Sequence, residues 1–267
     1  MNHQPKTIYF VSDMHFGIPD RTSSQIREEI FIKWLDAISE EASDLFIMGD
    51  MFDFWFEWKH VVPKGYIRLF GALAALSDKG IQLHFFTGNH DMWMFSYLQQ
   101  ELNANIYRKD TIVKLNGKKL YLSHGDGLGP GDRGYKFIKK LFRNRFAQWL
   151  YARMHPNFAV GLANFFSRTS RYSNKAKNAI NIVREQRLTD NQEVYAKTVL
   201  TQQHIDFFIF GHQHTPCSRK VSETSILFNI GNWINDYTFL KMNNGNISHY
   251  TYKSGVMEEF SGLKNDD

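Results

Sequence analysis

Short apolar runs alternate with longer amphipathic stretches over the first ninety residues of the chain. The runs Thr7–Ser12, Leu45–Met48 and Ile81–Thr87 are rich in β-branched and aromatic residues, which favours buried strands. Between them, Ser24–Ser39 and Lys64–Lys79 place apolar residues at helical spacing. This strand–helix–strand–helix–strand order predicts a layered α/β fold.

The rest of the chain predicts more strands around a long helical region. Two strand-like runs, Thr111–Leu115 and Lys119–Ser123, flank Asn116-Gly117, a dipeptide typical of a tight hairpin turn. The pattern is helical from about residue 133 to 203, and Asp206–Phe210 is again strand-like. The remaining residues alternate like a β-meander, with strands expected at Ser225–Ile230, Tyr237–Lys241 and Ile247–Tyr252.

The chain predicts one domain over residues 1–267, with a helical insertion at about 130–187, because no linker rich in Pro, Gly or Ser interrupts it. No apolar stretch approaches the roughly 20 residues of a membrane span, and the polar start does not resemble a signal peptide. The single cysteine, Cys217, fits a reducing compartment. We therefore expect a cytoplasmic protein, either soluble or peripheral to a membrane.

Polar side chains that bind metals follow five of the predicted strands. The carboxyl ends of strands meet where an open α/β sheet places its site, so these side chains should converge. In Asp13-x-His15 and in His212-x-His214, both side chains point to the same side of an extended chain. The full set of candidate metal ligands is Asp13, His15, Asp50, Asn89, His124, His212 and His214.

The donor atoms of this set are imidazole nitrogens and oxygens, with no thiolate. A carboxylate such as Asp50 can bridge two cations, and Asn89 adds a neutral carbonyl oxygen. The mixture suits Mn²⁺, Fe or Zn²⁺, and we expect two divalent ions, with Mn²⁺ preferred. Two metals about 3.5–4 Å apart are the usual clamp for phosphoester hydrolysis, since they hold the phosphate and lower the pKa of a bridging water.

Three further side chains beside the ligands are candidates for roles in catalysis. His90 follows Asn89 directly and is expected to protonate the leaving oxygen or to stabilise the transition state. Asp91 is expected to orient His90 through the other ring nitrogen, and Asp53 to support the ligands. Together with the bridging Asp50, His90 and Asp91 are the predicted catalytic residues.

Five short motifs, taken together, are similar to those of the calcineurin-like metallophosphoesterases. They are Asp13-x-His15, Gly49-Asp50-x-x-Asp53, Gly88-Asn89-His90-Asp91, His124-Gly125-Asp126 and Gly211-His212-x-His214, in the order of that superfamily. The resemblance implies a four-layer α/β/β/α sandwich. It also implies one metal held by Asp13, His15, Asp50 and His214, and another held by Asp50, Asn89, His124 and His212.

Other residues narrow the resemblance to one family within this superfamily. Asp132 lies eight residues after His124, Tyr135 follows, and the spacing Ser170-x-x-x-Asn174-x-x-Lys177 and the run Phe228–Trp233 come later. In these features the chain resembles the UDP-2,3-diacylglucosamine pyrophosphatases of lipid A biosynthesis, which are peripheral members of the superfamily. That family usually has Arg where this chain has His90. The resemblance implies a substrate-binding role for Asn89, Asp132, Tyr135, Ser170, Asn174, Lys177 and His212.

The charge of the chain is strongly uneven. The net charge is +5, but the segment Arg133–Arg187 carries +12 and the rest of the chain −7, which favours an anionic partner. Within that segment, Lys136–Met154 predicts a basic amphipathic helix of the kind that lies on anionic membranes, with ordinary packing on the core as the alternative. We expect the insertion to cap the site, hold acyl chains and contact the inner face of the cell membrane.

The main hypothesis is hydrolysis of UDP-2,3-diacylglucosamine to UMP and 2,3-diacylglucosamine 1-phosphate. One alternative is a phosphodiesterase or phosphatase acting on another nucleotide or nucleotide-lipid, which His90 favours. Another is a non-catalytic protein that binds RNA or a membrane through its basic segment. That segment contains no known nucleic-acid-binding motif, so we expect no nucleic-acid partner, and we predict no obligate protein partner.

Overall fold

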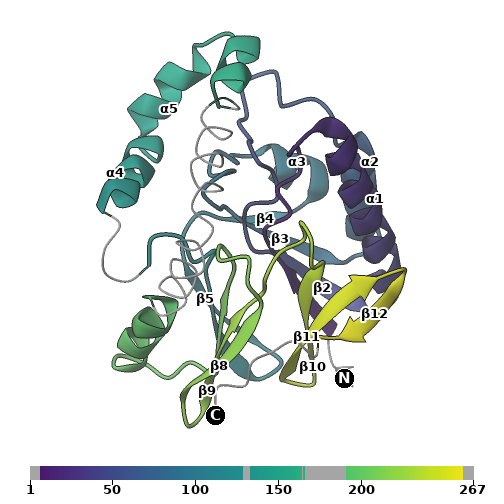
Figure 1. The fold of residues 1–267 in the computed structure, drawn as a ribbon, viewed down its shortest axis with the longest axis vertical. Coiled ribbons are helices and arrows are strands. Elements are labelled where there is room, and N and C mark those ends of the chain that lie inside the picture. Colours follow the sequence, from purple (N-terminus) through teal and green to yellow (C-terminus); the bar gives the residue numbers. More distant parts are fainter. Residues whose placement is uncertain (1–6, 129–132, 164, 166–190, 261–267) are drawn as a thin grey trace.

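Two β-sheets form the centre of the molecule (Figure 1). The computed structural model describes residues 7–128, 133–163, 165 and 191–260. The larger sheet contains β1 (Thr7–Val11), β2 (Ala42–Ile47), β3 (Gln82–Phe86), β4 (Asn105–Tyr107), β10 (Thr238–Asn243), β11 (Asn246–Lys253) and β12 (Val256–Glu259). The smaller sheet contains β5 (Thr111–Leu115), β6 (Lys118–Leu122), β7 (Phe207–Phe210), β8 (Cys217–Ser222) and β9 (Ser225–Asn229).

The strand order brings the carboxyl ends of several parallel strands to one edge. The seven-stranded sheet runs β12-β11-β10-β1-β2-β3-β4, and the five-stranded sheet runs β5-β6-β7-β9-β8. The neighbours β1, β2, β3 and β4 are parallel, as are β6, β7 and β9. The loops that leave these strands therefore gather at a common edge, which is where an open α/β sheet places its site.

Three hydrophobic clusters separate four layers. In β1, Tyr9 packs toward α1 (Arg21–Ile38), α2 (Ile67–Asp78) and α3 (Tyr97–Leu102), whereas Phe10 packs between the two sheets. The alternation follows from the period of two along a strand. On the far side of the smaller sheet, the helical residues 191–200 pack through Ala196. The layers are thus helices, sheet, sheet and helix, which confirms the predicted α/β/β/α sandwich.

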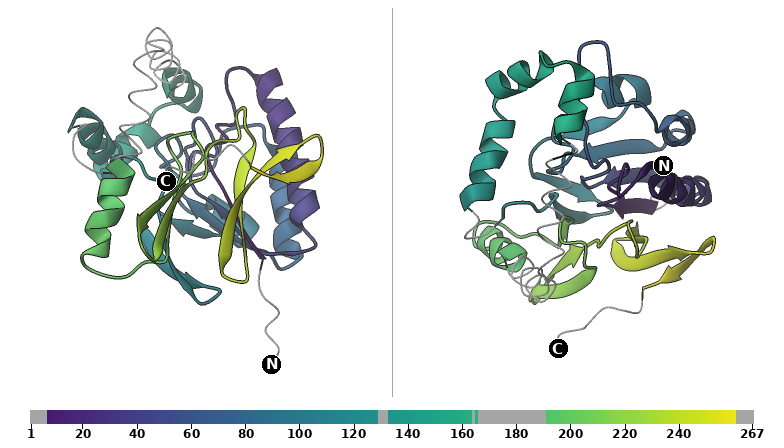
Figure 2. Two further views of the ribbon diagram at one scale, coloured as in Figure 1. Left: turned by 60° about the horizontal axis from the view of Figure 1, so that its bottom comes forward. Right: turned by 45° about the horizontal axis from the view of Figure 1, so that its top comes forward.

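The stretch predicted as an insertion contains separate helices rather than one long helix. Its described part comprises α4 (Arg133–Phe142), α5 (Arg145–Ala152) and the helical residues 156–163. The first helix ends at Phe142, and Asn144 caps the second, because its side chain accepts hydrogen bonds from the backbone N–H groups of Phe146 and Ala147. The prediction of one continuous helix over Lys136–Met154 is therefore wrong at Asn144. Figure 2 shows α4 and α5 forming an arm along one side of the molecule.

The strands of the last sixty residues do not form a single meander. β9 pairs in parallel with β7 and antiparallel with β8, so it belongs to the smaller sheet, whereas β10, β11 and β12 form a meander in the larger one. The predicted meander joined strands of different sheets and is wrong in that respect. The predicted hairpin of β5 and β6 is confirmed, and Asn116 and Gly117 both have positive φ, as a type I′ turn requires.

Among the described helices, none combines the length and the apolar character that crossing a membrane requires.

Candidate metal centre

The loops that follow β1, β2, β3, β6 and β7 bring the seven predicted ligands together. Most of these ligands have a backbone conformation that side-chain-bearing residues rarely adopt. Positive φ angles at non-glycine residues cost energy and cluster at functional sites, because the surrounding structure must hold them in place. The ligands in this conformation are Asp13 (φ 56°), His15 (φ 45°), Asp50 (φ 52°), His212 (φ 72°) and His214 (φ 59°).

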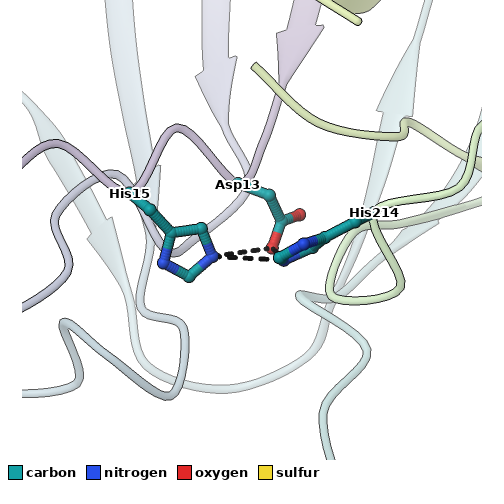
Figure 3. A group of neighbouring side chains, drawn as sticks. All are labelled: Asp13, His15 and His214. Carbon is teal, nitrogen blue, oxygen red and sulfur yellow. Dashed lines mark hydrogen bonds and ion pairs between the residues drawn. The ribbon is translucent and has the colours of Figure 1, made fainter. Parts of the chain in front are cut away.

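Asp13, His15 and His214 form the first cluster of ligand atoms (Figure 3). The Nε2 atoms of His15 and His214 lie 3.2 Å apart, and Asp13 Oδ1 lies 3.2 Å from His214 Nε2 and 3.7 Å from His15 Nε2. Asp13 Oδ1 is buried and has no hydrogen-bond partner among the described residues. Because metal–nitrogen bonds are about 2.1 Å long, two nitrogens this close could bind one shared cation.

Asp50, His124 and His212 form the second cluster. His124 Nδ1–H donates to the backbone carbonyl of Met48 at 2.8 Å, which leaves Nε2 facing the cluster. That Nε2 lies 3.3 Å from Asp50 Oδ2 and 3.3 Å from Asn89 Oδ1. A hydrogen bond from the second ring nitrogen to a fixed acceptor is the usual way in which a protein orients a metal-binding histidine.

Asp50 stands between the two clusters. Its Oδ2 is 3.3 Å from His124 Nε2 and 3.6 Å from His15 Nε2, so one carboxylate oxygen faces an imidazole from each cluster. A carboxylate in this place could contact a cation at either cluster, so the bridging role of Asp50 stays a prediction that these distances allow. The buried and unbonded Asp13 Oδ1, the converging imidazoles and the central carboxylate fit a pair of divalent cations.

Each of the two carboxylates is fixed by one oxygen and presents the other to the imidazoles. Asp13 Oδ2 accepts the backbone N–H of His212 at 2.8 Å, and Asp50 Oδ1 accepts the backbone N–H of His90 at 2.8 Å. Burial opposes ionisation, but the neighbouring histidines, His214 first for Asp13 and His124 first for Asp50, hold the pKa of both carboxyl groups below its usual range. Lowered pKa values favour the ionised form of both groups, which is the form that can bind a cation.

Glycines precede three of the ligands because there is no room for a Cβ. A Cβ on Gly88, which precedes Asn89, would lie 2.1 Å from Asp50 Oδ1. A Cβ on Gly211, which precedes His212, would lie 2.1 Å from Ser12 Oγ and 2.7 Å from Asp13 Oδ2. The ligand loops approach one another so closely that the backbone of one lies against the ligand of the next.

Asp53, rather than Asp91, contacts the His90 ring. His90 Nδ1 lies 3.0 Å from the backbone carbonyl of Asp53 and 3.3 Å from its Oδ1, which is also 3.5 Å from His15 Nδ1. Asp91 is fully buried, and its oxygens accept the backbone N–H groups of Gly88, Asp50, Met51 and Phe52. The expectation that Asp91 orients His90 therefore does not match these contacts, because its carboxylate is used to hold the loop after β2.

The predicted substrate-binding residues are distributed unevenly. Asn89 and His212 lie in the second cluster, and the Tyr135 ring is 6.4 Å from the His212 ring. The Tyr135 hydroxyl donates to Asp126, a contact that the sequence did not suggest. The remaining four, Asp132, Ser170, Asn174 and Lys177, lie outside the described residues.

Three buried side-chain amides lie behind the last ligand loop, and none of them was predicted individually from the sequence. Asn232 donates to the backbone carbonyl of His214 at 2.7 Å, and Asn229 donates to that of Gly211 at 2.8 Å. Gln192 donates to the same Gly211 carbonyl at 3.1 Å. The only sequence signal for them was the run Phe228–Trp233, which contains both asparagines. These amides hold the loop that carries His212 and His214.

Comparison with known proteins agrees with this geometry. The model of the calcineurin-like phosphoesterase family matches residues 6–216, a span that contains all seven candidate ligands. The chain belongs to this family. It is accordingly a metal-dependent hydrolase.

Relatives of this phosphoesterase carry a more specific name. The chain is 36% identical over 236 residues to a UDP-2,3-diacylglucosamine hydrolase from Porphyromonas gingivalis, and the match covers 85% of this chain and 90% of the relative. A protein of the same name from Edwardsiella ictaluri is 30% identical over 213 residues, covering 80% and 78%. Among solved structures, zinc-bound Vps29 from Entamoeba histolytica is similar with a TM-score of 0.42 and 14% identity, covering 94% of this chain and 96% of the other.

Proposed function

We propose that this phosphoesterase hydrolyses the diphosphate bond of UDP-2,3-diacylglucosamine, giving UMP and 2,3-diacylglucosamine 1-phosphate. The named relatives support this substrate, since they match the chain over most of its length. The structural observation that carries the proposal is an apolar cavity that adjoins the metal centre.

The cavity has a volume of about 350 Å³ and opens beside two residues of the centre, Asn89 and His90. Most of its remaining wall is apolar, which is the kind of surface that takes up an acyl chain. The core contributes Phe54 and Trp93, and the insertion contributes Ile138, Phe142, Tyr151 and Leu162. A phosphoester bound at the metal centre would therefore have an apolar pocket directly beside it, as a nucleotide-lipid needs.

The residues of the centre divide the work of this reaction between them. The seven ligands would hold two divalent cations, for which we propose Mn²⁺, and such ions neutralise phosphate charge and activate water. His90 donates its Nδ1–H to the backbone carbonyl of Asp53, so Nε2 is the ring atom left to face the cavity. From there it can contact the phosphate or the leaving oxygen. Asn89 presents its carbonyl oxygen beside His124.

The same proposal places the enzyme at the inner face of the cell membrane. Nine of the fifteen large apolar side chains that are exposed in the described part of the chain lie between residues 137 and 165. Basic residues are interleaved with them, and Arg153 lies over the Trp149 ring at 4.9 Å. An apolar face edged by cations is typical of a surface that lies on anionic lipid. The nine are Phe137, Ile138, Leu141, Phe142, Phe146, Trp149, Leu150, Phe158 and Phe165.

Membrane binding is tested by sedimentation with vesicles of phosphatidylglycerol and phosphatidylethanolamine. Trp149, half exposed on α5, is changed to Glu, and Ile67, 82% exposed on α2 outside the insertion, is changed to Glu as the matched control. We expect the first variant to lose binding and the second to retain it. Equal binding by both variants would contradict the proposed membrane face.

The substrate is tested by incubating the purified protein and Mn²⁺ with UDP-2,3-diacylglucosamine and measuring UMP. We expect metal-dependent release of UMP that is lost in Asp50→Ala. If no UMP appears while bis-p-nitrophenyl phosphate or a soluble nucleotide is cleaved, the substrate is wrong and the alternative of another nucleotide, which His90 favours, takes its place. Salt-sensitive RNA or membrane binding without any hydrolysis would instead indicate the non-catalytic alternative.

A further inference from the structure

A buried carboxylate ties the insertion to the loop of a metal ligand. Asp126 lies two residues after His124, and only 5% of its surface is exposed. Its Oδ2 accepts hydrogen bonds from the Tyr135 hydroxyl and, at 2.7 Å, from Lys139 Nζ. Lys139 Nζ also donates to the backbone carbonyl of Asp126 at 2.9 Å. One residue therefore receives three hydrogen bonds from α4.

The two donors lie on the face of α4 that covers the cavity. Tyr135, Ile138, Lys139 and Phe142 line that cavity, and their spacing of three and four residues puts them on one side of a helix. Phe137, on the other side, is 69% exposed. At its far end, α4 is held again, because Trp93 Nε1 donates to the backbone carbonyl of Phe142 at 2.8 Å. The position of the wall therefore depends on contacts at both of its ends.

The hydrogen bond between Lys139 and Asp126 is charge-assisted, and the Asp126 carboxylate is buried. A buried carboxylate bonded to an ammonium and a phenol is among the stronger hydrogen-bond arrangements, and it fixes geometry tightly. Gly127 allows the close approach, since a Cβ there would lie 3.2 Å from the Tyr135 ring. The same short loop thus holds His124 on one side and α4 on the other.

We propose that Asp126 is a positioning residue that couples the cavity wall formed by α4 to the metal-ligand loop at His124. Through this coupling, the wall is held at a fixed place relative to the phosphate. A substrate that fills the cavity benefits from it, whereas a small diester that binds only at the metals does not. Asp126 thereby contributes to selection of the lipid-bearing substrate, and this part of the inference rests on the proposed function.

The test compares Asp126→Asn and Lys139→Met with Lys140→Met, a change at an exposed position of the same helix. The first readout is amide hydrogen exchange of α4, which needs no substrate. We expect exchange in α4 to quicken about tenfold in the first two variants, as expected for the loss of one charge-assisted hydrogen bond, and to stay unchanged in the third. Unchanged exchange in Asp126→Asn and Lys139→Met would overturn the coupling.

The second readout is the ratio of kcat/KM for UDP-2,3-diacylglucosamine to kcat/KM for bis-p-nitrophenyl phosphate. We expect this ratio to fall about tenfold in Asp126→Asn and Lys139→Met, through a raised KM for the lipid, and to be unchanged in Lys140→Met. An equal fall for both substrates would mean that Asp126 acts on the metal centre itself, and would overturn the inference. If the wild-type protein does not cleave the lipid, the proposed function fails, and the exchange measurement alone decides the coupling.

Discussion

Gly88 offers a direct way to disturb both candidate ligand clusters with one methyl group. A Cβ added at this residue would lie 2.1 Å from Asp50 Oδ1, 2.5 Å from the Asp50 backbone nitrogen and 2.7 Å from its Cγ. Rotating the Asp50 side chain would relieve two of these contacts but not the one to the backbone. The loop after β2 must therefore move, and with it the carboxylate that faces both clusters.

The size of the effect follows from the overlap. Ordinary contacts begin at 3.4 Å, so the methyl carbon would enter the Asp50 carboxylate by about 1.3 Å. A displacement of about 1 Å in a catalytic group costs about 100-fold in rate, and overpacking in a buried place costs about 1–3 kcal/mol of stability. We expect Gly88→Ala to lose about 100-fold in kcat/KM and to bind Mn²⁺ at least tenfold more weakly, as when support for a ligand is lost.

The matched control is Gly71→Ala, since Gly71 lies on α2 and a Cβ there meets nothing within 4 Å. This change should leave hydrolysis untouched and stabilise the helix by about 0.5–1 kcal/mol. Calorimetric titration with Mn²⁺, hydrolysis of bis-p-nitrophenyl phosphate and urea unfolding measure the three quantities. A Gly88→Ala protein with wild-type Mn²⁺ affinity and turnover would refute the idea that Asp50 must stay where Gly88 allows it.

Three further outcomes are expected. Burial lowers the pKa of His249 to about 4, below its ordinary 6.5, so its contribution to stability is complete above pH 6.5 and is lost as the pH falls toward 4. In His249→Gln the new side chain can still donate to the Asn229 carbonyl but has no ring nitrogen to protonate. The fall in unfolding free energy between pH 7 and pH 4, measured by urea titration, should therefore be about 3 kcal/mol smaller than in the wild-type protein. An equal fall in both proteins would contradict this. Asn144→Ala should cost about 1 kcal/mol, measured as faster amide exchange confined to α5. Chelation should lower the unfolding midpoint, and Mn²⁺ at about 100 times its Kd should restore about 2.7 kcal/mol; equal midpoints with and without Mn²⁺ would argue against the metal centre.

The candidate metal ligands could be picked out from the sequence because each one closely follows a recognisable buried strand. A buried strand followed by Asp-x-His or Gly-Asp specifies both an element and a side chain at its end, and neighbouring strands bring such ends together. The structure brings Asp13 and His15 together and puts Asp50 beside His15, and metal binding by these residues stays a prediction. The role of Asp91 could not be predicted in the same way, because most of its hydrogen bonds come from backbone N–H groups of the loop after β2, about forty residues earlier.

The elements that were missed have weak or misleading patterns for identifiable reasons. β8 is an edge strand and β12 is largely exposed, so neither needs the apolar residues that mark a buried strand, and β4 is only three residues long. The sheet to which β9 belongs depends on pairing with β7, which no alternation within β9 can reveal. Likewise, the break between α4 and α5 could not be predicted, because apolar residues keep their helical spacing on both sides of the capping residue Asn144.

The way in which the ligand loops bind one another explains why so many ligands tolerate a strained backbone. The side chains of Asp13 and Asp50 each accept a hydrogen bond from a backbone N–H of a loop that carries another candidate ligand. The backbone N–H of His15 donates in turn to the backbone carbonyl of Asp50. The loops therefore hold one another before any cation binds, and the energy stored in the positive φ angles is offset by these shared contacts. The candidate site is therefore preformed by the protein alone. Asp50→Glu keeps the charge, but the longer side chain would lose the hydrogen bond from the His90 backbone N–H and would also move the oxygen that faces the imidazoles of His15 and His124.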